Sequence, residues 1–216
     1  MADGKYSDKA VAVIGLGGLG CNIAVHLAGE GIGKLKLCDF DTVTEGNLNR
    51  QFFYTPRDIG QSKVKKAAAF LNGYAPGTKT EIYEKKIERP SDLDFAKDCG
   101  MIMLAADNNT VRKTAAVFCA ENGIPLVNGG INGDFGTAYL YVPGVSPCPA
   151  CAGLTQTENV SPVSLSPVAG MIGALEAQLA LSFLGGENRA GILYIYDAGT
   201  VSALPVKKGK NCKICN

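Results

Sequence analysis

The apolar positions of the chain form short runs in one set of segments and recur at helical spacing in another. Short runs bounded by turn residues are typical of strands in a buried parallel sheet. The expected strands of the first half lie at 10–15, 34–39, 80–87, 101–106 and 124–129. The expected helices between them lie at 18–29, 62–72, 91–97 and 110–122. This alternation predicts a doubly wound α/β sheet with right-handed crossovers.

The pattern changes after residue 130. Segment 135–143 alternates like an antiparallel strand, and 192–206 has the pattern of a hairpin. Between them, a polar loop at 152–166 precedes a strongly apolar helix at 167–184. We therefore predict a Rossmann-like sheet that is mostly parallel and has antiparallel C-terminal strands.

Composition and length fit one globular domain, 1–216, with 46% apolar and 19% charged residues. We expect a nucleotide-binding half at 9–130 and a smaller C-terminal part at 131–216. The net charge of +1 argues against nucleic acid or an anionic membrane as a partner. The first residues have no apolar signal region, and no apolar run reaches the ~20 residues that span a bilayer. The expected location is the cytoplasm.

A glycine-rich loop, Gly15-Leu16-Gly17-Gly18-Leu19-Gly20, joins the first strand to the first helix. Its G-x-G-x-x-G pattern lets the backbone approach a phosphate at the positive end of a helix. Acids at the end of the next strand, Asp39 and Asp41, suit the ribose hydroxyls of a nucleotide. The predicted nucleotide contacts here are Gly15, Gly17, Gly18, Gly20, Asp39 and Asp41. The loop alone does not choose among NAD, FAD and ATP.

Polar residues follow the second strand, and they favour a triphosphate. They are Asn47, Arg50, Gln51 and Lys63. Ligands of open parallel sheets lie beyond the carboxyl ends of the strands, so these cations would face the phosphates. Arg offers two parallel hydrogen bonds and Lys a point charge. The alternative is that Arg50 and Lys63 are solvated surface charges.

The strand at 101–106 leads into Asp107, which falls over the same site. Its carboxylate is a natural Mg²⁺ ligand, although it could instead cap the following helix. Asn108 or Asn109 could serve as that cap. Arg112, one turn into the helix, could hold Asp107 in place or contact a substrate.

Four segments, in this order and spacing, resemble the ThiF/MoeB/HesA family, the bacterial relatives of ubiquitin-activating enzymes. They are GLGGLGCNIA, DFDTVTEGNLNRQF, GQSKV and DNNTVR, and the resemblance extends from about Lys9 to Cys215. It implies Mg·ATP binding and adenylation of the C-terminal glycine of a ubiquitin-like sulfur carrier such as ThiS or MoaD. It also implies a homodimer.

The resemblance assigns roles to individual residues. Gly17 and its neighbours would lie against ATP, and Asp39 would hold the ribose. Asn47, Arg50, Gln51 and Lys63 would surround the phosphates, and Asp107 would ligate Mg²⁺. Arg50, Lys63 and Asp107 are thus the expected catalytic residues.

The expected chemistry needs no general base, because a carboxylate nucleophile is already ionised at neutral pH. The site must offset repulsion between anions and stabilise the leaving pyrophosphate. Two cations and Mg²⁺ suit this task. The only histidine, His26, lies within the first helix, and we interpret it as structural.

Two C-x-x-C pairs, Cys148/Cys151 and Cys212/Cys215, predict a tetrahedral four-cysteine zinc site that pins the C-terminal tail to the domain. A redox pair or an iron–sulfur cluster are the alternatives. The other cysteines occur singly in apolar segments, and we expect buried small side chains there. They are Cys21, Cys38, Cys99 and Cys119.

The chain departs from the family pattern at two places. Many relatives have an N-terminal arm whose Arg reaches ATP in the partner subunit. The first nine residues here contain no Arg, and their positively charged side chains are Lys5 and Lys9. Val160 stands in the loop at 157–167 where sulfur-transferring relatives place a Cys. This favours adenylation alone, with sulfur delivered by a separate donor. The loop either guides the carrier's tail or is a simple connector.

Two other classes of protein share the glycine loop. An NAD- or FAD-dependent oxidoreductase would leave Arg50, Lys63 and Asp107 unexplained. A non-catalytic subunit of an adenylating complex would have no chemical need for Asp39 and these three residues together. ATP-dependent tRNA modification on the same fold is disfavoured by the lack of excess positive charge.

Overall fold

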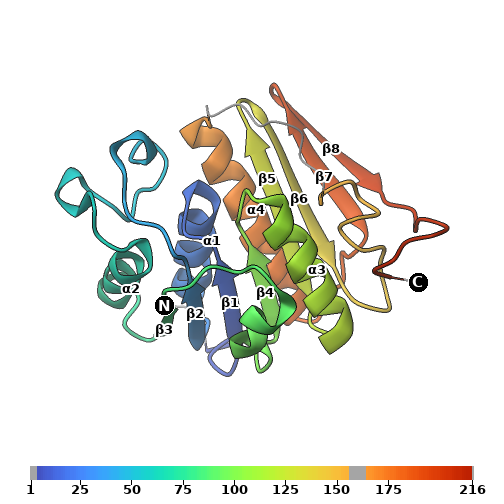
Figure 1. The fold of residues 1–216 in the computed structure, drawn as a ribbon, viewed down its shortest axis with the longest axis horizontal. Coiled ribbons are helices and arrows are strands. Elements are labelled where there is room, and N and C mark those ends of the chain that lie inside the picture. Colours follow the sequence, from blue (N-terminus) through green and yellow to red (C-terminus); the bar gives the residue numbers. More distant parts are fainter. Residues whose placement is uncertain (1–3, 156–163, 216) are drawn as a thin grey trace.

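The computed structural model describes residues 4–155 and 164–215, and its strands form one eight-stranded sheet in the order β3-β2-β1-β4-β5-β6-β7-β8 (Figure 1). The strands are β1 (Ala10–Ile14), β2 (Lys34–Cys38), β3 (Lys79–Tyr83), β4 (Met101–Leu104), β5 (Leu126–Asn132), β6 (Phe135–Tyr141), β7 (Ile192–Asp197) and β8 (Thr200–Pro205). Strands β1 to β5 pair in parallel, and β5 to β8 pair antiparallel. The predicted fold class is confirmed.

Four α-helices accompany the sheet in the part of the chain that the structure describes. They are α1 (Gly18–Gly29), α2 (Lys63–Tyr74), α3 (Asn109–Asn122) and α4 (Ser166–Leu184). Short 3-10 helices lie at Glu45–Asn47, Pro56–Asp58 and Pro90–Ala96. The expected helix at 91–97 is therefore a 3-10 helix. Strand β3 ends at Tyr83, before the expected residue 87, and its ladder with β2 stops there.

The topology switches direction beside β1. The chain passes from β1 to β2 on one side, and later enters β4 on the other side of β1. Loops that leave the carboxyl ends of β1 and β4 therefore separate and leave a crevice between them. Such switch points are where open α/β sheets bind their ligands.

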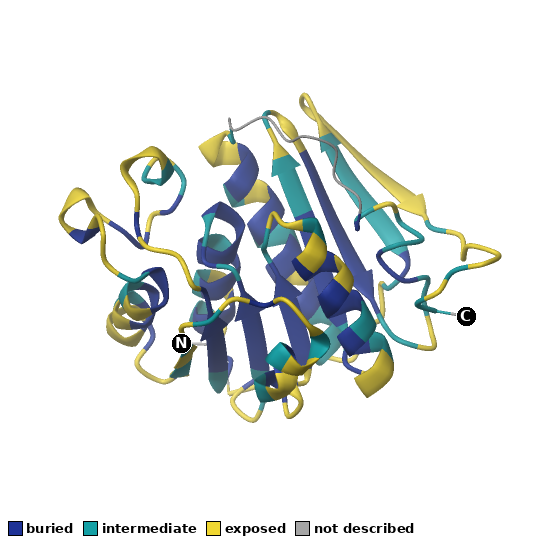
Figure 2. Cartoon of the chain, viewed as in Figure 1, coloured by how far each residue is buried: buried dark blue, intermediate teal, exposed yellow. Residues whose placement is uncertain are grey.

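Two apolar layers cover the two faces of the sheet, because successive strand residues point to opposite sides. Val11 and Val13 of β1 pack with residues of α1, α2 and α4. Ala12 and Ile14 pack with residues of α3 on the opposite face. Figure 2 shows that the central strands are buried, whereas β8 is exposed. The central strands form a rigid support for the loops at their carboxyl ends.

Helix α4 is the one described helix that is long and apolar enough to cross a membrane, with a mean hydropathy of 1.4. Half of that apolar window is buried inside the domain. Val168, Ile172 and Ala177 of α4 belong to the core layer that includes α1. Its apolar composition is therefore explained by packing within the protein.

Candidate nucleotide-binding site

The glycine loop turns sharply at the end of β1. Gly15 has φ +90°, a conformation that L side chains rarely adopt. A Cβ at Gly20 would collide with the carbonyl oxygen of Gly15, so the first turn of α1 lies directly against the loop. No side chain caps α1 at Gly17, so the first N–H groups of the helix are open to a ligand.

Asp39 holds the glycine loop as well as facing the crevice. Its carboxylate accepts the N–H of Leu16 at 2.6 Å and the N–H of Asp41 at 2.8 Å. Burial raises the pKa of Asp39, while the two backbone N–H groups oppose that shift. A hydrogen-bonded carboxylate fixed in this way is pre-organised for hydroxyl groups.

Lys63 is the first residue of α2, and only 5% of it is exposed. Its ammonium forms an ion pair with Asp41 at 3.2 Å, and both residues line the cavity described below. A buried lysine at a helix N-terminus is unfavourable for the helix dipole. Lys63 is therefore not the solvated surface charge that was the alternative from the sequence.

Arg50 lies beside the glycine loop and is held by its own segment. Its guanidinium donates to Asn49 Oδ1 at 2.9 Å, to Asn47 Oδ1 at 3.1 Å and to the carbonyl of Gly46 at 3.3 Å. Gln51 is 3% exposed, and its Oε1 has no hydrogen-bond partner. Unpaired buried polar atoms in folded proteins call for an explanation, and a ligand is one.

Asp107 is exposed at the end of β4 and does not cap α3. Asn108 is the cap, because its side chain accepts the N–H of Thr110 at 2.7 Å. Arg112 forms no salt bridge with Asp107 in the described structure; its Nη1 donates to Asn128 Oδ1 at 2.9 Å. The Asp107 carboxylate is left facing the cavity.

A cavity of about 1030 Å³ brings these side chains together. Of the predicted nucleotide contacts, it is lined by Gly15, Gly17, Gly18, Asp39, Asp41, Asn47, Arg50, Gln51, Lys63 and Asp107. Gly20 packs against the backbone of Gly15 and does not line the cavity. Apolar walls that the sequence analysis missed come from Phe40, Ile87, Leu193 and Ile195. Strand β7 of the C-terminal hairpin thus forms one wall of the cavity, whereas the charged lining groups come from the half of the domain that contains the parallel strands.

The second predicted centre is also assembled. The sulfur atoms of Cys148 and Cys212 lie 3.4 Å apart, those of Cys151 and Cys215 3.6 Å, and those of Cys148 and Cys151 3.9 Å. All four sulfurs lie within 4.8 Å of one another. Four sulfurs around one zinc ion are ~3.8 Å apart, given Zn–S bonds of ~2.3 Å, whereas a disulfide needs ~2 Å. The donor set fits a tetrahedral metal and could hold zinc.

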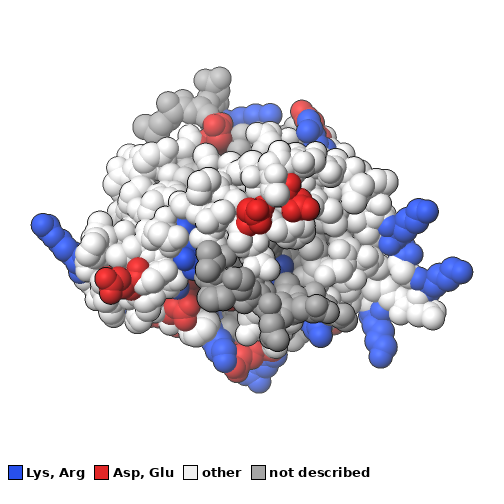
Figure 3. Space-filling model, turned by 90° about the horizontal axis from the view of Figure 1, so that it is seen from above, with Lys and Arg blue, Asp and Glu red and all other residues white. Residues whose placement is uncertain are grey.

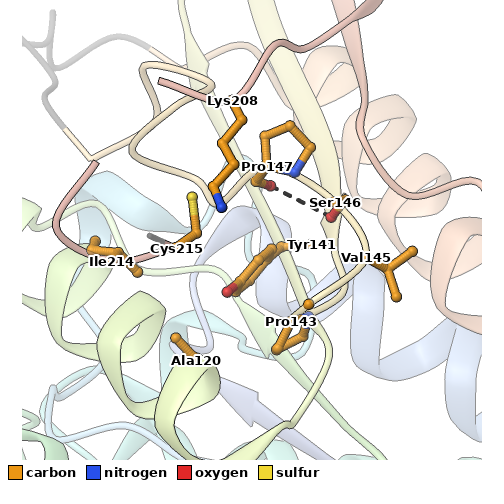
Figure 4. Close-up of a pocket in the computed structure, with 10 residues that line it drawn as sticks. Ala120, Tyr141, Pro143, Val145, Ser146, Pro147, Lys208, Ile214 and Cys215 are labelled. Atoms are coloured by element: carbon orange, nitrogen blue, oxygen red, sulfur yellow. Dashed lines mark hydrogen bonds between the residues drawn. The ribbon is translucent and has the colours of Figure 1, made fainter. Parts of the chain in front are cut away.

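A smaller hollow of about 240 Å³ lies beside this cysteine cluster and away from the nucleotide cavity (Figure 4). Tyr141 of β6 and Lys208 and Ile214 of the tail line it. Figure 4 shows Cys215 at the edge of the hollow near the end of the Lys208 side chain, with its sulfur directed away from the ring of Tyr141. The C-terminal segment therefore lies beside β6, and its attachment there by a bound metal stays a prediction.

Four further expectations from the sequence concern residues outside the two sites. Cys21, Cys38, Cys99 and Cys119 are buried, and burial raises the pKa of Cys38 to about 12 and of Cys99 to about 11. His26 is exposed on α1 and does not line the cavity. Val160 lies outside the described residues. Lys5 and Lys9 do not line the cavity either; Lys9 pairs with Asp8 at 2.9 Å.

Charged groups of both signs are spread over the surface seen in Figure 3. At the end of the molecule that carries the C-terminal segment, the projecting charged side chains are Lys and Arg. Residues 198–215 contain four lysines and no acid.

A switch-point crevice with a glycine loop and clustered cations defines the chain as a nucleotide-binding α/β domain. The model of the ThiF family matches residues 3–215. Two curated relatives are the molybdopterin-synthase adenylyltransferase of Salmonella typhimurium and the SAMP-activating enzyme E1 of Haloferax volcanii, each 31% identical. The first match covers 96% of this chain and 87% of the relative, and the second covers 98% and 82%. The chain belongs to the ThiF family and is an adenylyltransferase.

Solved structures show the same fold. Escherichia coli MccB, determined with MccA-N7isoASN, has a TM-score of 0.89 at 23% identity, with 98% of this chain and 68% of that chain covered. PaaA has a TM-score of 0.80 at 21% identity, with 94% and 65% covered. At this identity the likeness concerns the fold alone.

Proposed function

We propose that the protein uses ATP to adenylate the C-terminal glycine of a small ubiquitin-like sulfur carrier of the ThiS or MoaD type. The products are a carrier acyl-adenylate and pyrophosphate. The observation that carries this proposal is the cavity itself, which places Arg50, buried Lys63 and Asp107 around an open helix N-terminus. Relatives named for the activation of molybdopterin synthase and of SAMP support the choice of substrate.

The reaction follows from these groups. A carboxylate oxygen of the carrier attacks the α-phosphorus, the bond to the β-phosphate bridging oxygen breaks, and pyrophosphate leaves with the electron pair. No proton is transferred, so no general base is needed. Arg50 and Lys63 stabilise the negative charge that accumulates on the phosphates in the transition state. The N–H groups at the start of α1 hold the nucleotide in line.

Asp107 would hold Mg²⁺, since an exposed carboxylate facing a triphosphate suits an ion that prefers oxygen ligands. When bound, Mg²⁺ neutralises phosphate charge and helps the leaving group to depart. We also propose Zn²⁺ at Cys148, Cys151, Cys212 and Cys215, in a structural role. Four thiolates leave no open coordination position for catalysis.

The remaining expectations complete the proposal. Val160 stands where sulfur-transferring relatives have a cysteine, so sulfur would come from a separate donor after adenylation. The cytoplasm is the expected location, and a homodimer the expected assembly. Sedimentation velocity tests the assembly directly, with a mass of about twice the 22.5 kDa of one chain as the expected result.

The test of the function is ATP–pyrophosphate exchange with Mg²⁺, with and without small carriers that end in Gly-Gly. Exchange that requires one carrier establishes the reaction and identifies the partner. ATP binding without exchange for any carrier would favour a non-catalytic subunit. NAD or FAD binding without ATP binding would contradict the proposal and favour an oxidoreductase.

A further inference from the structure

Arg112 of α3 is a buried cation without a carboxylate partner. Only 4% of it is exposed, yet the described chain offers it no salt bridge. Its Nη1 donates to Asn128 Oδ1 at 2.9 Å and to the carbonyl of Leu154 at 3.5 Å, while its buried Nε has no hydrogen-bond partner among the described residues. A buried charge of this kind is costly unless an anion accompanies it.

The nearest buried acid, Glu176 of α4, does not supply that anion. Glu176 is fully buried, and neither carboxylate oxygen has a hydrogen-bond partner. It lies on the other side of β5: a side chain at Gly129 would meet Glu176, whereas one at Gly130 would meet Arg112 Nη2 at 3.1 Å. Burial raises the pKa of Glu176 well above its usual range, which favours the uncharged acid. Glu176 and Asp107 act on the charge of Arg112 from a distance, but no acid of the described residues forms a salt bridge with it.

Arg112 lines the nucleotide cavity at a different end from the phosphate cations. Lys63 pairs with Asp41 beyond β2, whereas Arg112 is held by Asn128 of β5. Strands β1 and β4 lie between β2 and β5 in the sheet. Three strand spacings of ~4.8 Å separate the two ends of the site by ~14 Å. The cavity thus has a cation at each of two separate ends, so it could bind two anionic groups at the same time.

The end of the cavity beside Arg112 leaves room for a peptide chain. Gly130 carries no side chain next to the guanidinium, where a Cβ would lie 3.1 Å from Nη2. Gly153 also lines the cavity, and the carbonyl of Leu154 accepts a hydrogen bond from Arg112 Nη1. A cation beside glycine backbone suits a tail of glycines that ends in a carboxylate.

We propose that Arg112 binds the terminal carboxylate of the carrier and positions it for attack on ATP. This inference rests on the proposed function and specifies how that site recognises its second substrate. Asn128 orients the guanidinium through Nη1, and Nη2, which lies beside the cavity-lining Gly130, is available to one carboxylate oxygen. The other oxygen remains free to attack phosphorus.

The test compares a Gly-Gly carrier that supports exchange with the same carrier ending in a carboxamide. Binding of each is measured by calorimetry to the wild-type protein and to Arg112→Lys, which keeps the charge and loses the planar fork. We expect the wild type to prefer the carboxylate by about 10-fold or more. Arg112→Lys should reduce that preference to about 2-fold while the Kd for ATP changes less than about 2-fold.

Three controls keep the result specific. Arg50→Lys should weaken ATP binding and retain the preference for the carboxylate. Glu176→Gln, which replaces an uncharged acid with an amide of equal size, should also retain it. Asn128→Ser removes the acceptor that orients Arg112 and should reduce the preference, which provides a second variant where Arg112→Lys does not fold.

Two outcomes would overturn the inference. One is a wild-type protein that binds acid and amide carriers equally, and the other is an undiminished preference in folded Arg112→Lys or Asn128→Ser. Either could occur while carrier-dependent exchange proceeds normally. Absence of exchange with every carrier would instead contradict the proposed function, so the two failures are distinguishable.

Discussion

In the nucleotide cavity, charged side chains of both signs contact one another, whereas at the cysteine cluster four identical groups converge on one point. Lys63 is paired with Asp41, and Arg50 with side-chain and backbone oxygens, so each group already has a partner that a ligand can replace. The four sulfurs have only each other and backbone groups such as the N–H of Gly209.

This difference shows what each region is built to do. Exchangeable partners keep Lys63 and Arg50 paired when no ligand is bound. Convergent thiols suit a metal ion, and a metal bound by all four would be part of the fold. The comparison predicts that changes in the cavity affect activity, and changes in the cluster affect stability.

The largest effect is expected for Lys63→Ala. Loss of a buried cation that stabilises transition-state charge should lower the rate of pyrophosphate exchange by about 10²- to 10³-fold. The thermal unfolding temperature should change little by comparison, because the partner, Asp41, is half exposed and becomes solvated. Lys65→Ala is the matched control: Lys65 lies on the same helix, is exposed and pairs with Glu84 at 2.6 Å. Equal rates for the two variants would refute the assignment of Lys63.

The second prediction tests whether a change in the cysteine cluster lowers stability without weakening nucleotide binding. Cys212→Ser should remove bound zinc, from about one ion per chain to none, and lower Tm by roughly 10 °C. At temperatures where the variant remains folded, the Kd for ATP should stay within about 2-fold of the wild type. Metal analysis, calorimetric unfolding and ATP titration together make the measurement. Cys99→Ser changes a cysteine outside the cluster and should leave the zinc content unaltered.

The smallest effect concerns Asp58, in the 3-10 helix before α2. Its carboxylate pairs with Lys66 at 2.6 Å and accepts the N–H and hydroxyl of Thr55, and these contacts lower its pKa to about 2. The folded pKa lies below the unfolded one, so this stabilisation is present above pH 4 and is lost as pH falls toward 2.

Asp58→Asn should therefore lower the free energy of unfolding by about 1 kcal/mol at pH 7, a value that allows for the exposure of the pair. The deficit relative to the wild type should shrink as the pH is lowered from 4 to 2. Urea titrations over that range check both parts. A deficit that is independent of pH would show that the contacts of Asp58 do not act through its charge.

The sequence was sufficient for the parts of the fold that depend on local pattern. Gly15 marks a turn with positive φ, and short apolar runs mark β1 and β4, because these signals arise within a few residues. Local signals also placed Arg50 and Asp107 correctly beyond the strand ends. The boundary of β3 was less accurate, because an edge strand buries little and its alternation is weak.

Long-range partners could not be predicted in the same way. The ion pair of Lys63 with Asp41 and the burial of Arg112 depend on how separate elements pack. The burial of Glu176 could not be predicted from the sequence, because a single acid within an apolar helix resembles a surface position. The apolar walls from β7 were missed because the hairpin follows the glycine loop by more than 170 residues.

Under the proposed function, the ion pair between Lys63 and Asp41 would make nucleotide loading an exchange of anions. A phosphate would displace a carboxylate that is already in place, whereas a nucleoside without phosphates would have no group to replace it. Affinity would thereby be graded by the charge of the nucleotide, from adenosine through AMP to ATP. After the products leave, Asp41 would pair with Lys63 again, without any rearrangement of the sheet.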